Sequence, residues 1–256
     1  MKIVIKIGTS SLTHKTGRLN IRKVEKMVKI LSDVKNAGHE LILVSSGAIA
    51  MGVGKLNLPA RPEDIPTKQA CAAVGQCELM YTYDNLFTEY RHTVAQLLLT
   101  AEDFEQEDRR VNFENTMDRL LQLGALPIIN ENDTIATSEI KVGDNDTLGA
   151  IVAIAVKADL LILFSDIDGL YDKDPHQHDD AKLIPVVEKV TQEIYALAGG
   201  KGSAMATGGM QTKLRAAQMV TASGTNMIIA NAERMEGLYD VLEGKSIGTL
   251  FKAKKI

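Results

Sequence analysis

The chain has 256 residues, of which 45% are hydrophobic and 24% are charged, and its formal net charge is −4. This length and apolar fraction suit one large α/β unit with a sizeable core. The acidic balance, with no basic run beyond the short tail Lys252–Lys255, argues against nucleic-acid binding, and the longest apolar stretches are too short to span a membrane.

The first residues and the cysteines indicate a cellular location. Met1–Lys6 has a charge within its apolar run and no small-residue cleavage site, so it predicts a strand and not a signal peptide. Cys71 and Cys77 lie six residues apart in a predicted helix, which suits neither a disulfide framework nor a zinc site. We therefore expect a protein of the reducing cytoplasm.

Apolar runs of strand length alternate with helical patterns along almost the whole chain. Continuous runs of Ile, Leu and Val are typical of strands covered on both faces, and their alternation with helices predicts a mostly parallel sheet with helices on both sides. Ligands of such sheets bind in the loops at the carboxyl ends of the strands. The predicted strands are Lys2–Ile7, Glu40–Val44, Val94–Leu99, Leu126–Ile129, Leu160–Phe164 and Met227–Ala230. The first predicted helix begins after Asn20, its N-cap, and ends near Gly38. The other predicted helices are Thr67–Tyr90, Asp108–Leu123, Asp146–Lys157, Gly209–Ala222 and Arg234–Leu242.

Two glycine-bearing loops follow the first two strands. In the first, Gly8 lets the backbone approach a phosphate closely and Lys6 adds a mobile charge. The alternative is a simple turn at the exposed end of an edge strand. In the second, Ser46 and Gly47 open a helix whose free N–H groups suit a carboxylate or phosphate, although an ordinary serine cap explains the same residues.

A third glycine-bearing loop, Thr207–Lys213, opens the helix that follows it. Lys213 lies on the first turn, where the helix dipole favours an anion, although most lysines are simply solvated surface residues. No Gly-x-x-x-x-Gly-Lys-Ser/Thr sequence occurs, which disfavours a P-loop kinase.

Polar loops follow two further strands. Asn130–Asp133 and Lys141–Asp146 form a dense set of carboxylates and amides, which can accept hydrogen bonds from a substrate ammonium or donate to a carboxylate. Turn formation explains one or two of these residues but not the whole set. The loop Ser165–Pro175 can hold the ribose or base edges of a nucleotide, and it lacks the glycine and distal glutamate spacing of an EF-hand.

Together these segments resemble the amino acid kinase family, and within it the kinases that act on the side-chain carboxylate of glutamate. The matching segments occur in the order of the family and span nearly the whole chain. They are Lys6–Ser10, Ser46–Ala50, Ile129–Asp133, Lys141–Asp146, Ser165–Asp166 and Thr207–Lys213.

The resemblance implies a three-layer α/β/α sandwich formed by a single domain over residues 1–256. Its N-terminal lobe, about 1–150, is expected to bind the amino acid, and its C-terminal lobe, about 151–256, ATP. Many relatives carry an extra C-terminal domain of the PUA type, and this chain resembles the short form without it. The implied roles are as follows: Lys6, Lys213 and Asp146 are catalytic; Ser46, Gly47, Asp133 and Asn145 bind substrate; Lys6, Gly8, Ser165, Asp166, Thr207, Gly208, Gly209, Met210, Gln211, Thr212 and Lys213 bind ATP.

The resemblance also implies the reaction, the phosphorylation of L-glutamate by ATP in the first step of proline biosynthesis, with Mg²⁺ held through the ATP phosphates and by no protein ligand. A carboxylate acceptor is ionised at neutral pH and needs no general base, and none of the histidines lies in a matched segment. Other kinases of this fold, which act on N-acetylglutamate, aspartate or UMP, are the nearest alternatives. A catalytically silent sensor is another, although it would be expected to lack the two lysines.

The expected partners are L-glutamate and ATP, with a downstream glutamyl phosphate reductase, no nucleic acid and no membrane. The family implies a homo-oligomer, either a dimer or a tetramer. The position of the reaction in its pathway also implies inhibition by proline, at a site that the residues do not locate.

Overall fold

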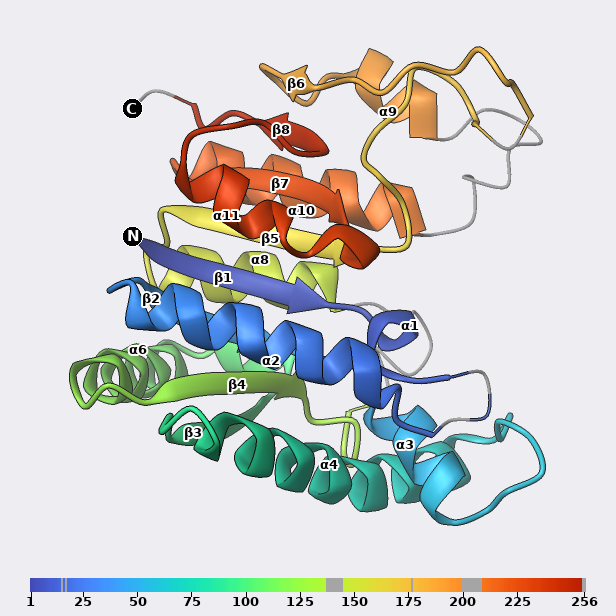
Figure 1. Ribbon diagram of the computed structural model, residues 1–256, viewed down its shortest axis with the longest axis vertical. Coiled ribbons are helices and arrows are strands. Elements are labelled where there is room, and N and C mark those ends of the chain that lie inside the picture. The colour runs from blue at the N-terminus through green and yellow to red at the C-terminus, as the bar shows by residue number, and fades with distance from the viewer. Residues whose placement is uncertain (15, 17, 137–144, 176, 199–208, 255–256) are drawn as a thin grey trace. The chain divides into compact units, whose positions relative to one another are not determined.

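The computed structural model describes residues 1–14, 16, 18–136, 145–175, 177–198 and 209–254 (Figure 1). The chain divides into two compact units. Residues Met1–Lys6 and Asp146–Ile256 form one, which we call the C-terminal unit, and Ile7–Asn145 form the other, the N-terminal unit. Each unit contains a mostly parallel sheet with helices on both faces, as the alternation of strands and helices predicts.

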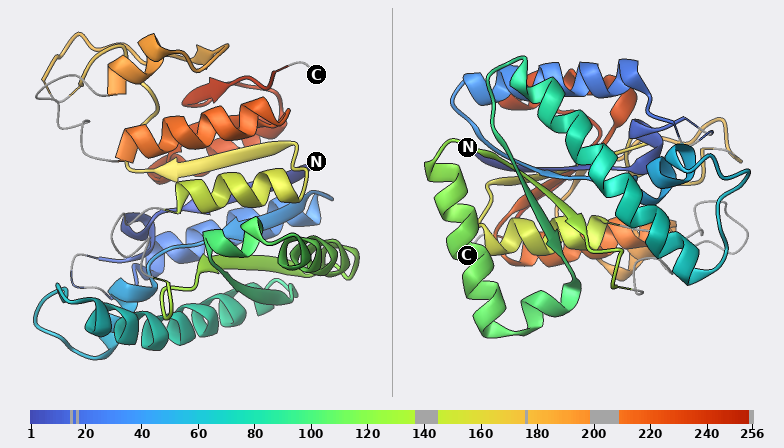
Figure 2. Two further views of the ribbon diagram at one scale, coloured as in Figure 1. Left: turned by 180° about the vertical axis from the view of Figure 1, so that it is seen from behind. Right: turned by 90° about the horizontal axis from the view of Figure 1, so that it is seen from below.

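The sheet of the C-terminal unit has the order β1-β5-β7-β8-β6. Strands β5 and β7 pair in parallel over six residues, whereas β8 runs antiparallel to β7. Helices α8 and α10 pack on one face and α11 on the other (Figures 1 and 2). The elements are β1 (Lys2–Ile7), α8 (Asp146–Ala155), β5 (Leu160–Ser165), β6 (Val186–Val187), α9 (Gln192–Ala198), α10 (Gly209–Ala222), β7 (Asn226–Asn231), the 3-10 helix η2 (Ala232–Arg234), α11 (Gly237–Leu242) and β8 (Thr249–Phe251).

The sheet of the N-terminal unit has the order β3-β4-β2, and all of its strands are parallel. Helices α2 and α4 cover one face, and α6 lies on the other (Figure 2). The elements are α1 (Thr9–Leu12), α2 (Ile21–Asn36), β2 (Glu40–Val44), α3 (Ala48–Lys55), α4 (Ile65–Thr88), β3 (Val94–Leu99), α5 (Ala101–Glu105), α6 (Glu107–Gln122) and β4 (Leu126–Glu131).

The six predicted strands all form, three of them with the predicted ends, and each predicted helix overlaps an observed one. Asn20 caps α2 as expected, because its side chain accepts a hydrogen bond from the backbone N–H of Lys23. Two short strands, β6 and β8, were not predicted. A run of two or three residues carries no periodic signal, and these strands form through pairing with β8 and β7.

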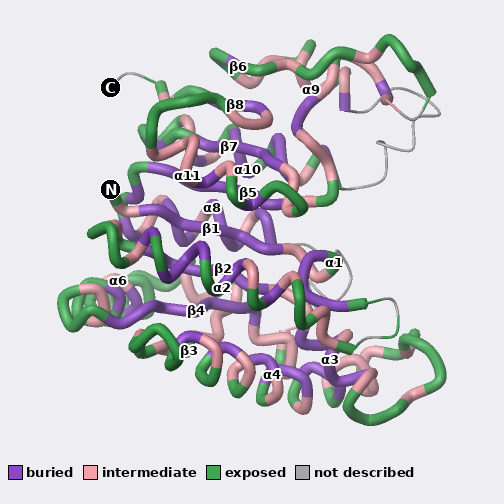
Figure 3. Tube along the Cα trace, in the orientation of Figure 1, coloured by how far each residue is buried: buried purple, intermediate pink, exposed green. Residues whose placement is uncertain are grey.

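Strand β3 corrects one expectation. Its apolar run predicts a strand covered on both faces, yet Gln96 is exposed and its other residues are only half-buried (Figure 3). The reason is its place in the sheet, since β3 pairs with β4 on one side and forms the edge of the order. Sequence periodicity reports the hydrophobicity of a strand but not its neighbours.

Helices α3 and α4 approach each other backbone to backbone. A Cβ added to Gly52 would lie 1.9 Å from the carbonyl oxygen of Cys71, and one added to Gly75 would lie 1.8 Å from that of Ala48. No side chain larger than hydrogen fits at either position. This crossing fixes the start of α3, and therefore the Ser46–Gly47 loop that precedes it, against α4.

Both cysteines are free thiols; Cys71 is buried in the α3–α4 contact and Cys77 is exposed. Of the helices within the described residues, none combines the length and the hydropathy that crossing a bilayer requires.

Candidate active site

Three charged side chains meet inside the C-terminal unit. Lys6 is the penultimate residue of β1, Asp146 begins α8 and Lys213 lies in the first turns of α10. The Nζ of Lys6 is 2.7 Å from Asp146 Oδ1, and the Nζ of Lys213 is 2.7 Å from Oδ2. All three residues are buried, with exposed fractions of 6%, 0% and 7% for Lys6, Asp146 and Lys213. Neither lysine is therefore a solvated surface residue, which was the alternative interpretation of these lysines from the sequence.

Electrostatics favours the charged form of this cluster. Burial by itself raises the pKa of Asp146, but the charges of Lys6 and Lys213 outweigh it and hold that pKa below its ordinary value. The carboxylate is thus ionised at neutral pH. The three side chains carry two positive charges and one negative charge, so the cluster can attract a phosphate while Asp146 fixes both ammonium groups in place.

The other segments predicted to bind a nucleotide are only partly described. Ser165 ends β5 and donates a hydrogen bond of 3.0 Å to Asp166. In α10, Gly209 and Gln211 are exposed, Met210 is buried, and Thr212 donates to the carbonyl oxygen of Gly209. Thr207, Gly208 and the segment Lys141–Asp144 lie outside the described residues.

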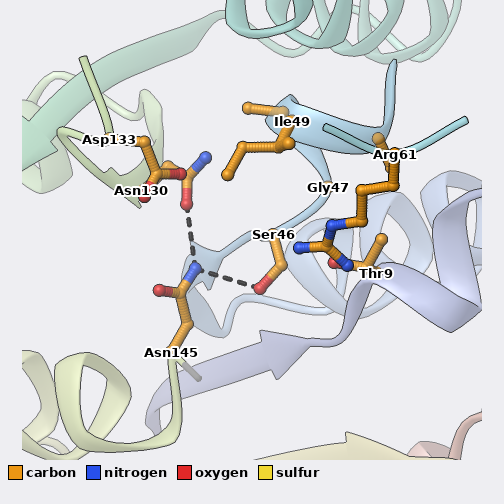
Figure 4. A pocket seen from close by; sticks show the side chains of 10 residues that line it. Thr9, Ser46, Gly47, Ile49, Arg61, Asn130, Asp133 and Asn145 are labelled. Atoms are coloured by element: carbon orange, nitrogen blue, oxygen red, sulfur yellow. Dashed lines mark hydrogen bonds between the residues drawn. The ribbon is translucent and has the colours of Figure 1, made fainter. Parts of the chain in front are cut away.

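A small polar pocket lies inside the N-terminal unit (Figure 4). Gly47, at φ +102°, turns the chain into α3, and this left-handed conformation favours glycine. The pocket contains all four residues predicted to bind the substrate, since Ser46, Gly47, Asp133 and Asn145 line it together. The remaining lining residues are Thr9, Ala48, Ile49, Ala50, Arg61 and Asn130.

A chain of amide side chains orders one wall of this pocket. The Nδ2 of Asn145 donates to the Ser45 carbonyl oxygen at 2.7 Å, to Ser46 Oγ at 2.9 Å and to Asn130 Oδ1 at 2.8 Å. The Nδ2 of Asn130 in turn donates to Gln76 Oε1 on α4 at 2.8 Å. Because Asn145 donates to Ser46, the serine hydroxyl hydrogen remains available for an acceptor in the pocket.

Asp133 is the acidic residue among the described residues that line the pocket. Burial raises its pKa to about 6, and the positive charge of Arg61 opposes this rise. The carboxylate is therefore mostly ionised at pH 7, although it loses much of its hydration. A ligand ammonium would replace the lost water, which makes Asp133 a suitable acceptor for an amino group.

Gly8 has room for a side chain within the protein. Its φ is −77°, and a Cβ added to it would meet no atom within 4 Å. Neither backbone strain nor packing against the described residues requires glycine there, and as the N-cap of α1 Gly8 stands at a position where glycine is common.

Arg61 and Gln76 shape the pocket and had no predicted role. Asn130 was predicted only as part of the polar segment Asn130–Asp133, and Thr9 only as part of the matched segment Lys6–Ser10. Arg61 and Gln76 lie in a loop and a long helix without a motif, and only folding brings them to the other residues.

Comparison with known proteins gives the family. A model of the amino acid kinase family matches residues 1–231. The chain belongs to the amino acid kinase family. It is 52% identical to glutamate 5-kinase of Clostridium perfringens, over 99% of this chain and 96% of that protein. It is also 50% identical to glutamate 5-kinase of Caldanaerobacter subterraneus, over 100% of this chain and 68% of that longer protein.

Solved structures show the same fold at lower identity. Carbamate kinase from Giardia lamblia bound to AMP-PNP superposes with a TM-score of 0.67 at 20% identity, covering 99% of this chain and 98% of the other. UMP kinase from Ureaplasma parvum gives 0.65 at 16% identity, covering 98% of each chain. These likenesses confirm the predicted α/β/α fold of the amino acid kinase family.

Proposed function

We propose that this chain transfers the γ-phosphoryl group of ATP to the side-chain carboxylate of L-glutamate, forming L-glutamyl 5-phosphate in the first step of proline biosynthesis. The observation that carries the proposal is the identity of 52% to a glutamate 5-kinase over 99% of the chain. The geometry of the two units is compatible with this reaction, since one holds a cationic cluster and the other a pocket with groups for an amino acid.

The chemistry needs charge neutralisation more than proton transfer. A glutamate side chain has a pKa of ~4.3, so the acceptor is ionised at neutral pH and requires no general base. The barrier comes from bringing two anions together in line. In this proposal Lys6 and Lys213 contact the transferred phosphoryl group, and Asp146 holds both ammonium groups in position before the substrate arrives. The distances of 2.7 Å on each side of Asp146 support that role.

Glutamate is proposed to bind in the pocket of the N-terminal unit. Asp133 accepts from its ammonium group, the Ser46 hydroxyl donates to a carboxylate, and Asn145 and Gly47 shape the site. The hydrogen bond from Asn145 to Ser46 supports this assignment because the serine oxygen is the acceptor in it, which leaves the hydroxyl hydrogen available for a ligand. A substrate with an acetylated amine would not need Asp133, which favours glutamate over N-acetylglutamate.

ATP is proposed to bind through Gly8, Ser165, Asp166 and the segment Thr207–Lys213. The described residues contain no group of three or more His, Cys, Asp or Glu side chains arranged to hold a metal ion. Mg²⁺ is proposed to bind through the ATP phosphates, where it would neutralise their charge. The same proposal includes a cytoplasmic location, a dimer or tetramer, and a reductase that consumes the acyl phosphate.

A coupled assay of ADP release, with hydroxylamine to trap the acyl phosphate, tests the reaction directly. Lys6→Ala and Lys213→Ala should lower kcat far more than they raise the KM for glutamate, and Lys29→Ala, which removes an exposed lysine of α2, is the matched control. Near-normal turnover in both variants would contradict the phosphate-contacting role. A panel of glutamate, N-acetylglutamate, aspartate and UMP identifies the acceptor, and preference for any other member would reject glutamate.

A further inference from the structure

Arg61 brings a positive charge to the pocket of the N-terminal unit. It lines the pocket with Ser46 and Asp133, and among the described residues its guanidinium forms no hydrogen bond or ion pair. In Figure 4 the guanidinium points toward Ser46 and Thr9, whereas Asp133 stands beside Asn130. The charges of Arg61 and Asp133 nevertheless act on each other, because Arg61 opposes the effect of burial on the pKa of Asp133.

The charges of an amino acid substrate explain such a pair. Glutamate carries one ammonium and two carboxylates, and the reaction proposed above leaves the side-chain carboxylate to meet the phosphoryl group. Asp133 complements the ammonium, but the four residues predicted to bind the substrate include no cation for the α-carboxylate. Within the described lining of the pocket, Arg61 is the one positively charged side chain.

The protein holds Arg61 near the pocket through a short anchored loop. Three residues later Asp64 caps α4, accepting a hydrogen bond of 2.9 Å from the backbone N–H of Thr67. Gly52 and Gly75 then lock α4 against α3, which begins at the Ser46–Gly47 loop. The side chain itself remains exposed and can move onto a ligand as it enters.

We infer that Arg61 binds the α-carboxylate of the amino acid substrate and so selects free α-amino acids with an ionised α-carboxyl group. The inference rests on the proposed function. A guanidinium presents two parallel N–H groups that match a carboxylate, and such charge-assisted pairs are stronger than neutral hydrogen bonds. Arg61 and Asp133 together then recognise the two charges at the α-carbon, leaving the side-chain carboxylate free to react.

The test compares L-glutamate with L-isoglutamine, whose α-carboxyl group is a neutral carboxamide, in the wild type, Arg61→Met, Arg61→Lys and the control Arg22→Met. Arg22 is an exposed residue of α2. The assay measures ADP release and trapped acyl phosphate. We expect Arg61→Met to lower kcat/KM for glutamate about tenfold, chiefly through KM, and to change kcat/KM for isoglutamine less than about twofold. Arg61→Lys keeps the charge but loses the paired N–H groups. Its kcat/KM for glutamate should therefore lie between those of the wild type and Arg61→Met.

Other outcomes are distinguishable. A glutamate KM in Arg61→Met equal to that of the wild type overturns the inference, as does an equal loss on both substrates, which would assign Arg61 to a group that they share. A wild type that phosphorylates neither compound overturns the proposed function itself. Because Arg61 makes no hydrogen bond within the described protein, the melting temperature of Arg61→Met should match that of Arg22→Met, which separates binding from folding.

Discussion

Replacement of Asp133 by asparagine should stabilise the protein at neutral pH while it weakens the binding of glutamate. Burial raises the pKa of Asp133 in the folded chain to about 6, whereas an unfolded aspartate has a pKa of ~3.9. A raised folded pKa means that folding favours the protonated form. The stabilising contribution of the group is therefore fully present below pH ~3.9 and is lost as the pH rises through about 6.

The magnitude follows from the two pKa values. A difference of about two units, at about 1.36 kcal/mol per unit, gives a cost of about 3 kcal/mol at pH 7. At pH 5 the cost is about 1.5 kcal/mol, and it vanishes below pH ~4. Asparagine keeps the shape of the side chain and carries no charge, so Asp133→Asn should recover this free energy. The total stability of such a domain is only about 5–15 kcal/mol.

Urea unfolding of the wild type and Asp133→Asn at pH 5 and pH 7 measures the effect. The variant should show a higher midpoint at pH 7, by about 1 M, and a smaller gain at pH 5, together with a raised KM for glutamate. A variant that is less stable than the wild type at pH 7, or a gain that grows as the pH falls, would refute the reasoning from burial.

Three further substitutions probe the same two sites. Asp146→Asn leaves two buried lysines without their shared carboxylate and should lower the free energy of unfolding by about 3–5 kcal/mol at neutral pH. Urea unfolding measures this loss, which should disappear as the pH falls through the lowered pKa of Asp146 in the folded protein. Gly75→Ala places a methyl group 1.8 Å from the Ala48 carbonyl oxygen, so α3 must move; both the melting temperature and the affinity for glutamate should fall. Gln76→Met leaves the buried Nδ2 of Asn130 without its acceptor, which should cost about 1–3 kcal/mol and raise the KM for glutamate.

Each has a matched control. Asp133→Asn is the control for Asp146→Asn, because the same chemical change should raise the free energy of unfolding at pH 7 at position 133 and lower it at position 146. Gly149→Ala is the control for Gly75→Ala, since the added Cβ would lie at an ordinary 3.5 Å from Lys6. This substitution should leave the melting temperature unchanged or slightly higher. Gln122→Met is the control for Gln76→Met. It removes an exposed glutamine that accepts a hydrogen bond from Arg119, and it should change neither the free energy of unfolding nor the KM for glutamate. Equal effects in a variant and its control would contradict the corresponding argument.

Local sequence determined the elements and the family. Continuous apolar runs such as Glu40–Val44 formed strands with the predicted ends, and Asn20 capped its helix, because the sequence signals for both features lie in neighbouring residues. The ordered segments around Lys6, Ser46 and Lys213 were sufficient to indicate the amino acid kinase family, which the comparisons establish. Short strands such as β8 gave no local signal.

Tertiary structure decided the environment of each side chain. A sequence cannot show that Asp146 lies between two lysines from β1 and α10, or that Asp133 is buried enough to raise its pKa, since burial depends on elements distant in the chain. The same holds for Gln76 and Arg61, which come from a helix and a loop without a motif. Charges and hydrogen bonds act over a few ångströms of space, and only the fold sets those distances.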